Sequence, residues 1–167
     1  MAQSSTSTSN RANALAERLL KGANALATYA EGLSEDEWQT PVIGDGRSVG
    51  VVVHHVASVY PIEVELAQLL AKGEPITEAT PEVINQMNAN HAQENRNVGK
   101  QETLELLKKN SKIAANSIRE FADEDLDSAA TVSLNANAPL TAQFFIEDHA
   151  LRHSYHHLAK IKAAIGK

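Results

Sequence analysis

Apolar residues recur at the spacing of an α-helix over most of the chain. Residues 11–32 are rich in alanine and in leucine at helical intervals, and Gly32 stands where a helix commonly ends. A second apolar segment begins after Ser48, a good N-cap, and continues to Leu70, with Pro61 expected to bend it or loosen one turn. The pattern therefore predicts two long helices in the first half of the chain.

A short motif separates these two segments. Ser34 and Glu37 stand at the spacing of a capping box, and Leu33 and Trp38 flank the box as a hydrophobic staple. This arrangement predicts a short helical turn that packs Trp38 inward.

Two further long helices are predicted in the second half of the chain. One begins at Pro81, and residues 97–99 are expected to kink or split it. The last covers residues 140–165. Between them, residues 122–139 form a long connection that is first acidic and then rich in Ser, Thr and Asn, with a weak β-like pattern at 130–134.

Four long helical segments in 167 residues predict an all-α fold, a single four-helix bundle over residues 11–167. The long connection before the last helix permits a topology other than simple up-and-down. Residues 1–10 are rich in Ser and Thr, and we expect them to form a disordered N-terminal tail.

Composition and charge exclude several functions. A formal net charge of −6 does not favour phosphate backbones, so we expect no nucleic-acid partner. The absence of cysteine excludes disulfides, Cys-ligated zinc, iron–sulfur clusters and a cysteine nucleophile. The N-terminus has no basic start or apolar stretch typical of a signal peptide, and no apolar run approaches the roughly 18 residues of a membrane span. We therefore expect a cytoplasmic protein with no membrane partner.

Histidine is the unusual component, because four of the seven histidines fall between positions 149 and 157. On a helical wheel His153 and His157 lie at the margin of the apolar face, whereas His149 and His156 lie on the polar side. Residues four apart on a helix stand about 5–6 Å apart at Cβ, so two imidazoles at this spacing can converge on one cation. The alternative is a solvated polar face, where histidines are also common.

The second helix contributes a further histidine. His55 lies in the middle of an apolar stripe, and its neighbour His54 is turned about 100° away. A buried imidazole needs a partner, because an unsatisfied polar group costs about 1–3 kcal/mol. That partner is either a hydrogen-bonding side chain or a cation shared with His153 and His157, and we favour the cation. His91 lies in a polar stretch, and we expect a solvated residue there rather than a fourth ligand.

Other chemistries of helical bundles are not supported by the sequence. No Glu precedes a His by three residues, as di-iron carboxylate bundles require, and no His is followed by Glu, as in zinc proteases. A Gly-rich phosphate loop and a Gly-x-Ser-x-Gly nucleophile motif are also absent.

Three stretches resemble a known family. Residues 32–38 read GLSEDEW and residues 46–57 read GRSVGVVVHHVA, and together they resemble the opening half of the DinB-like (DinB/YfiT) superfamily. Residues 145–161 read FIEDHALRHSYHHLAKI and resemble the His-x-x-x-His helix of the same superfamily. The resemblance extends over roughly residues 11–165.

This resemblance implies a four-helix bundle in which one histidine of the second helix and the His-x-x-x-His pair of the last helix bind a divalent metal. By their positions in the motifs these ligands are His55, His153 and His157, the same three that the helical wheels select. Three features depart from the family pattern: Arg47 stands where Trp is usual, Lys160 stands where Gln is usual, and Pro61 interrupts the second helix.

Three neutral histidines leave coordination positions open, which is the layout of a catalytic metal site. The reacting group would be a metal-bound water or thiol, and no catalytic side chain is assigned. The resemblance implies transfer of a low-molecular-weight thiol to an electrophile, thiol-dependent isomerisation, or hydrolysis. We hypothesise a metal-dependent S-transferase or hydrolase acting on a small electrophilic molecule, with Zn, Ni or Fe as the cation.

Several alternatives stay open at this point. The neighbouring histidines 54, 149 and 156 are competing ligands, and Glu147, Asp148 and Tyr155 are candidates for positioning the ligands. The runner-up function is a bundle that binds a metal or small ligand without catalysis. A third alternative is a dimerisation module, a homodimer in which an exposed apolar rim matters more than the pocket.

Overall fold

The computed structural model of the protein describes residues 9–167, and residues 1–8 of the predicted tail lie outside the described residues. The helices in chain order are α1 (Asn10–Glu31), α2 (Glu35–Trp38), α3 (Val49–Ala71), α4 (Pro81–Glu94), α5 (Lys100–Arg119), α6 (Asp123–Asp127), α7 (Ala142–Phe145) and α8 (Arg152–Ile165). The remaining elements are the strands β1 (Ala129–Val132) and β2 (Ala138–Thr141), the 3₁₀ turn η1 (Ser133–Asn135) and the π-helical segment η2 (Ile146–Leu151).

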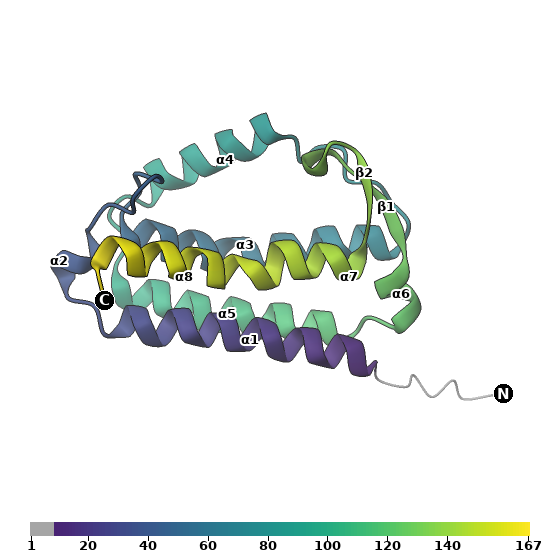
Figure 1. Ribbon diagram of the computed structural model, residues 1–167, viewed down its shortest axis with the longest axis horizontal. Helices are drawn as coiled ribbons and strands as arrows, with labels where there is room; N and C mark the ends of the chain where they lie inside the picture. Colours follow the sequence, from purple (N-terminus) through teal and green to yellow (C-terminus); the bar gives the residue numbers. More distant parts are fainter. Residues whose placement is uncertain (1–8) are drawn as a thin grey trace.

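A four-helix bundle is formed by α1, α3, α5 and the continuous run of α7, η2 and α8 (Figure 1). Both α1 and α3 pack against α5 and α8, so α1 and α3 lie diagonally across the bundle. α3 and α5 begin at the same end and run parallel, as do α1 and α8 (Figure 1). The predicted all-α bundle is confirmed, and its topology is not simple up-and-down.

The hydrophobic core lies between the four helices of the bundle and is formed by their apolar faces. Apolar residues at helical spacing make up one face of each helix, and this face turns inward because burial removes it from water. Each of the four helices contributes fully buried side chains, among them Leu19, Leu26, Val52, Tyr60, Leu107, Ile118, Ile146 and Ile161.

α4 lies outside the bundle. None of its residues is buried, and it crosses back over α3 from the end where α3 stops to the end where α5 begins (Figure 1). The predicted third helix is therefore two helices, separated at residues 95–99. Because α4 is polar on most sides, it covers α3 without joining the core.

A small hairpin closes one end of the bundle. β1 and β2 pair antiparallel, with Ala129 opposite Thr141 and Val132 opposite Ala138. β1 confirms the weak β-like pattern at 130–134. The last helix begins two residues later than predicted, because residues 140–141 belong to β2 and the Thr141 side chain caps α7 by accepting from the Phe144 N–H.

The π-helical segment η2 changes which residues of the last helix face inward. A π-turn adds one residue to the helical turn and rotates everything before it by about 100°. The regular wheel places Phe144 on the apolar face and Phe145 on the polar side, whereas Phe145 is buried and Phe144 is 48% exposed. His149 lies inside η2 and is half-buried, not on a solvated face as predicted.

α3 is apolar on two sides because it has two different neighbours. Val53, Val56 and Val64 are buried in the core, while Val59 and Leu66 are only partly buried beneath α4 and the hairpin. Among the described helices α3 alone is long and apolar enough to span a membrane by composition. However, 61% of its most apolar window is buried inside the bundle. Packing against protein accounts for its apolar character.

Trp38 anchors the α2 turn against the start of α3. Its side chain is 1% exposed, and its Nε1–H donates to the Val98 carbonyl at 3.1 Å, which ties the loop before α5 to the same point. The predicted capping box is present, with Ser34 accepting from the Glu37 N–H. Gly50 allows the close approach, because a Cβ there would lie 2.4 Å from Trp38 Nε1.

Gly50→Ala is expected to lower the free energy of unfolding by about 1–3 kcal/mol, because the methyl group overpacks the indole. Urea unfolding followed by circular dichroism measures the loss, and fluorescence of the single tryptophan reports its displacement. Gly32→Ala is the matched control, since its Cβ would meet nothing closer than 3.6 Å. Equal stability of the two variants would contradict the proposed anchoring.

Candidate metal centre

The imidazoles of His55 on α3 and of His153 and His157 on α8 meet inside the bundle. One ring nitrogen of each lies within 4.8 Å of the other two, and this is the sole such group of three His, Cys, Asp or Glu side chains in the described part of the chain. The geometry follows from the i, i+4 spacing on α8 and from the packing of α8 on α3. The juxtaposition expected from the wheels is present, and the role of these residues as ligands stays a prediction.

Glu63 orients one of the three rings. Its Oε1 lies 2.6 Å from His153 Nδ1, on the side of the ring opposite the cluster. A carboxylate there accepts the Nδ1–H and leaves the Nε2 lone pair of His153 free toward His55, whose Nε2 is 3.1 Å away. This carboxylate–histidine pair is the arrangement that commonly stands behind a metal-binding imidazole.

The donor set fits a divalent cation. His157 is buried, and its Nδ1 has no hydrogen-bond partner, nor has the second carboxylate oxygen of Glu63. Buried polar atoms are normally satisfied, so such atoms beside converging imidazoles indicate a group that these side chains are built to bind. Three nitrogen donors suit Zn, Ni or Fe better than Mg or Ca, which prefer oxygen.

Burial keeps two of the three imidazoles, those of His55 and His157, neutral. It lowers the pKa of His55 to about 2 and that of His157 to about 3, and the neighbouring His153 and Arg47 act in the same direction. Neutral imidazole is the form that binds a metal. Arg47 is held by Asp45, with Nε–Oδ1 and Nη2–Oδ2 distances of 2.5 and 2.7 Å.

His54 and His91 form a second pair beside the cluster. His54 Nδ1 lies 2.9 Å from His91 Nε2, and the His91 ring lies 5.6 Å from the His55 ring. Burial lowers the pKa of His91 to about 4, and its Nδ1 is buried without a partner. The prediction that His91 is a solvated helix residue is therefore wrong, because α4 lies over α3 and brings His91 onto His54.

The remaining histidines of the last helix differ in environment. His149 stacks on Phe145 with ring centroids 4.2 Å apart, and burial lowers its pKa. Its Nε2 is buried and without a hydrogen-bond partner. His156 is exposed, as the polar side of the wheel predicts.

The predicted positioning residues are engaged elsewhere. Glu147 pairs with Arg18 at 2.7 Å, and Asp148 pairs with Arg152 at 2.9 Å. Tyr155 is 43% exposed. Glu63, which sequence reasoning missed, takes the role instead. Its signal in the sequence was a carboxylate about two turns after His55, between the apolar residues Ile62 and Val64.

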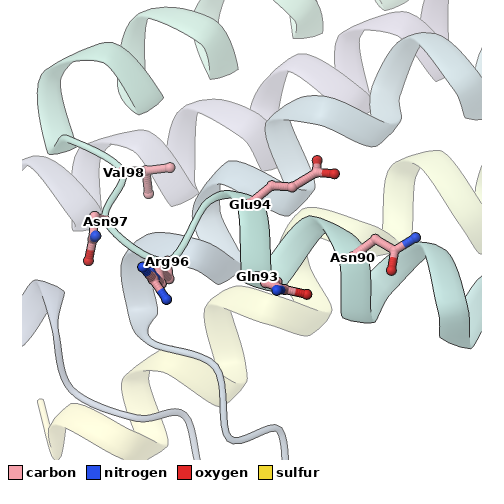
Figure 2. A pocket seen from close by; sticks show the side chains of 6 residues that line it. All are labelled: Asn90, Gln93, Glu94, Arg96, Asn97 and Val98. Atoms are coloured by element: carbon pink, nitrogen blue, oxygen red, sulfur yellow. The ribbon is translucent and has the colours of Figure 1, made fainter.

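Two cavities adjoin the histidine cluster and share His149 and His153 in their linings. One, of about 150 Å³, is mostly apolar, and the other, of about 180 Å³, is polar and includes Arg152, His156 and His157. A larger hollow, of about 650 Å³, has no histidine in its lining. It lies at the end of α4 and along the following loop and is lined by Asn90, Gln93, Glu94, Arg96, Asn97 and Val98 (Figure 2).

We expect the metal-free protein to lose stability as the pH falls below about 6.5, the ordinary pKa of histidine. The unfolded chain then binds protons that the buried His55 and His157 do not. Each residue contributes up to about 1.4 kcal/mol per pH unit in that window. Urea unfolding between pH 7 and 5 measures the slope. His55→Gln should flatten it more than His156→Gln, whose ring is exposed although its pKa is also lowered, and equal slopes for the two variants would refute the assignment.

Comparison with known proteins places the chain in a family. The model of the DinB superfamily matches residues 18–161. No curated protein matches the chain. Among solved structures the chain is similar to YfiT from Bacillus subtilis, described as a probable metal-dependent hydrolase with an unusual four-helix bundle topology.

The likeness to YfiT has a TM-score of 0.70 at 15% sequence identity and covers 99% of this chain and 94% of that chain. At this identity it shows a shared fold. Because the family match spans most of the sequence, the chain belongs to the DinB superfamily.

Proposed function

We propose that the protein is a metal-dependent enzyme in which His55, His153 and His157 hold one divalent cation. The observation that carries the proposal is the convergence of three imidazoles, one of them backed by the Glu63 carboxylate at 2.6 Å. Such a cation, held by three neutral ligands, would lower the pKa of a water or thiol that binds to it.

The residues of the chain have distinct tasks in this proposal. The three histidines bind, and Glu63 holds the Nδ1 proton of His153 so that Nε2 points into the cluster. Burial of His55 and His157 keeps both rings unprotonated at neutral pH. The mostly apolar cavity on one side limits the access of water.

We infer that the reaction is hydrolysis, or transfer of a low-molecular-weight thiol, at a small electrophilic molecule. The likeness to YfiT, described as a probable metal-dependent hydrolase, supports hydrolysis. For thiol transfer, the chain has no cysteine and the thiol must be a second substrate. The polar cavity beside Arg152 and Asp148 suits the charged groups that such thiols carry.

Metal content tests the site directly. Protein purified without an affinity tag and without added nickel should contain one divalent cation per chain by elemental analysis. His55→Ala, His153→Ala and His157→Ala should each lose it, and Glu63→Gln should weaken binding about 10- to 100-fold, because the ring orientation is no longer fixed.

His156→Ala is the matched control, because His156 is adjacent to His157 but exposed. It should keep a full equivalent of cation, and circular dichroism should show that every variant folds. A His157→Ala protein that still binds one equivalent with unchanged affinity would overturn the three-histidine site.

Turnover separates an enzyme from a bundle that only binds metal. A panel of small electrophiles, assayed with and without a low-molecular-weight thiol, should give activity that His157→Ala abolishes. Chelation should abolish activity and re-addition of the cation should restore it. If His157→Ala changes only the melting temperature and no turnover is found, the non-catalytic alternative is correct.

A further inference from the structure

A mostly apolar cavity lies against the histidine cluster and has no assigned occupant. Apolar residues of its wall include Val59 and Leu66 from α3, Ile84 from α4, Val132 from β1 and Phe145 from α7. The cavity volume is about 150 Å³. These aliphatic and aromatic side chains give the space the character of a ligand pocket rather than of a solvent channel.

Most polar groups of the wall are gathered at the histidine cluster. His153 contacts both Glu63 and His55, and these three side chains form one polar patch, while Asn88 and His149 are the other polar residues of a mostly apolar lining. A molecule that fills the cavity would therefore lie with one part on hydrocarbon and another part against the three-histidine cluster.

Charge restricts the occupant further. No Lys or Arg lines the cavity, and its one carboxyl side chain is that of Glu63, already engaged by His153. A carboxylate or phosphate in the apolar part would be buried without a cationic partner, which is strongly unfavourable. The lining therefore selects an uncharged molecule.

The volume of the cavity limits the size of the molecule that can occupy it. A cavity of about 150 Å³ lined by leucine, isoleucine and phenylalanine is large enough to admit benzene. Ile62 from α3 and Met87 from α4 both line the cavity and are 41% and 47% exposed. They mark an apolar rim through which such a molecule can enter.

We propose that this cavity binds the apolar part of a small uncharged molecule, a six-membered ring or an aliphatic chain of similar volume, and presents its polar end to the histidine cluster. Binding itself needs only the cavity, whereas the identification of this molecule as the electrophilic substrate rests on the proposed function. A charged thiol would then approach from the polar cavity that shares His149 and His153.

Methyl-selective NMR provides the test, with benzyl alcohol as the neutral probe and benzoate as its charged counterpart. Titration with benzyl alcohol should shift the methyl signals of Val59, Leu66 and Ile84. The methyl signals of Leu19 and Leu107, in the core between the four helices, should stay unchanged. In chelated protein benzoate should bind about tenfold more weakly or worse, because its carboxylate finds no cation.

Val59→Phe should fill the cavity and weaken benzyl alcohol binding by about tenfold or more. Val83→Phe makes the same change at a residue of α4 that is 45% exposed and not part of the lining, and it should bind like the parent protein. If Val59→Phe does not fold, Ile84→Phe serves instead, because α4 has no buried residue and tolerates added bulk.

His157→Ala separates this proposal from the metal proposal, since His157 does not line the apolar cavity. That variant should keep benzyl alcohol binding after it loses the cation. Equal binding to Val59→Phe and Val83→Phe, or benzoate binding as tight as benzyl alcohol in chelated protein, would overturn the cavity proposal and leave the metal site untouched.

Discussion

Buried polar pairs hold α3 against α8. The packing of the bundle and the geometry of the candidate metal centre both depend on this contact. Tyr60 hydrogen-bonds Ser154, and Glu63 and His55 both contact His153. The Tyr60–Ser154 and Glu63–His153 pairs satisfy groups that would otherwise be buried without a partner at a cost of about 1–3 kcal/mol per group. The pairs therefore fix the register of the two helices, and that register brings His157 to His55.

Much of this arrangement can be predicted from the spacing of residues along single helices. The i, i+4 pair on the last helix places two imidazoles on one face whatever the rest of the fold does. His55 in an apolar stripe needs a partner, and a four-helix bundle offers few places where that partner can be. These two constraints are enough to predict, from the sequence alone, that the three histidines meet inside an all-α fold.

What sequence reasoning missed depends on departures from regular periodicity or on tertiary neighbours. The π-turn in η2 rotates the preceding residues, so a wheel with a fixed angle exchanges Phe144 and Phe145 and misplaces His149. α3 is apolar on two sides, so its periodicity does not show which side faces the core and which faces the cavity. His91 meets His54 only because α4 crosses over α3, a path that no local pattern encodes.

The path of α4 and the π-turn η2 also give the candidate metal centre one apolar side and one polar side. Because α4 and the hairpin cover α3 without filling the space above it, the Val59 side of the cluster is lined by hydrocarbon. Because η2 turns Phe145 inward and leaves His149 between the two cavities, the other side opens among Arg152 and His156. In the proposed function, a cluster of imidazoles at the boundary of an apolar and a polar space would receive two reactants of opposite character from two different sides. This division follows from where α4 and η2 lie, and not from the ligands themselves, so bundles with the same three histidines but a different cover are free to act on different molecules.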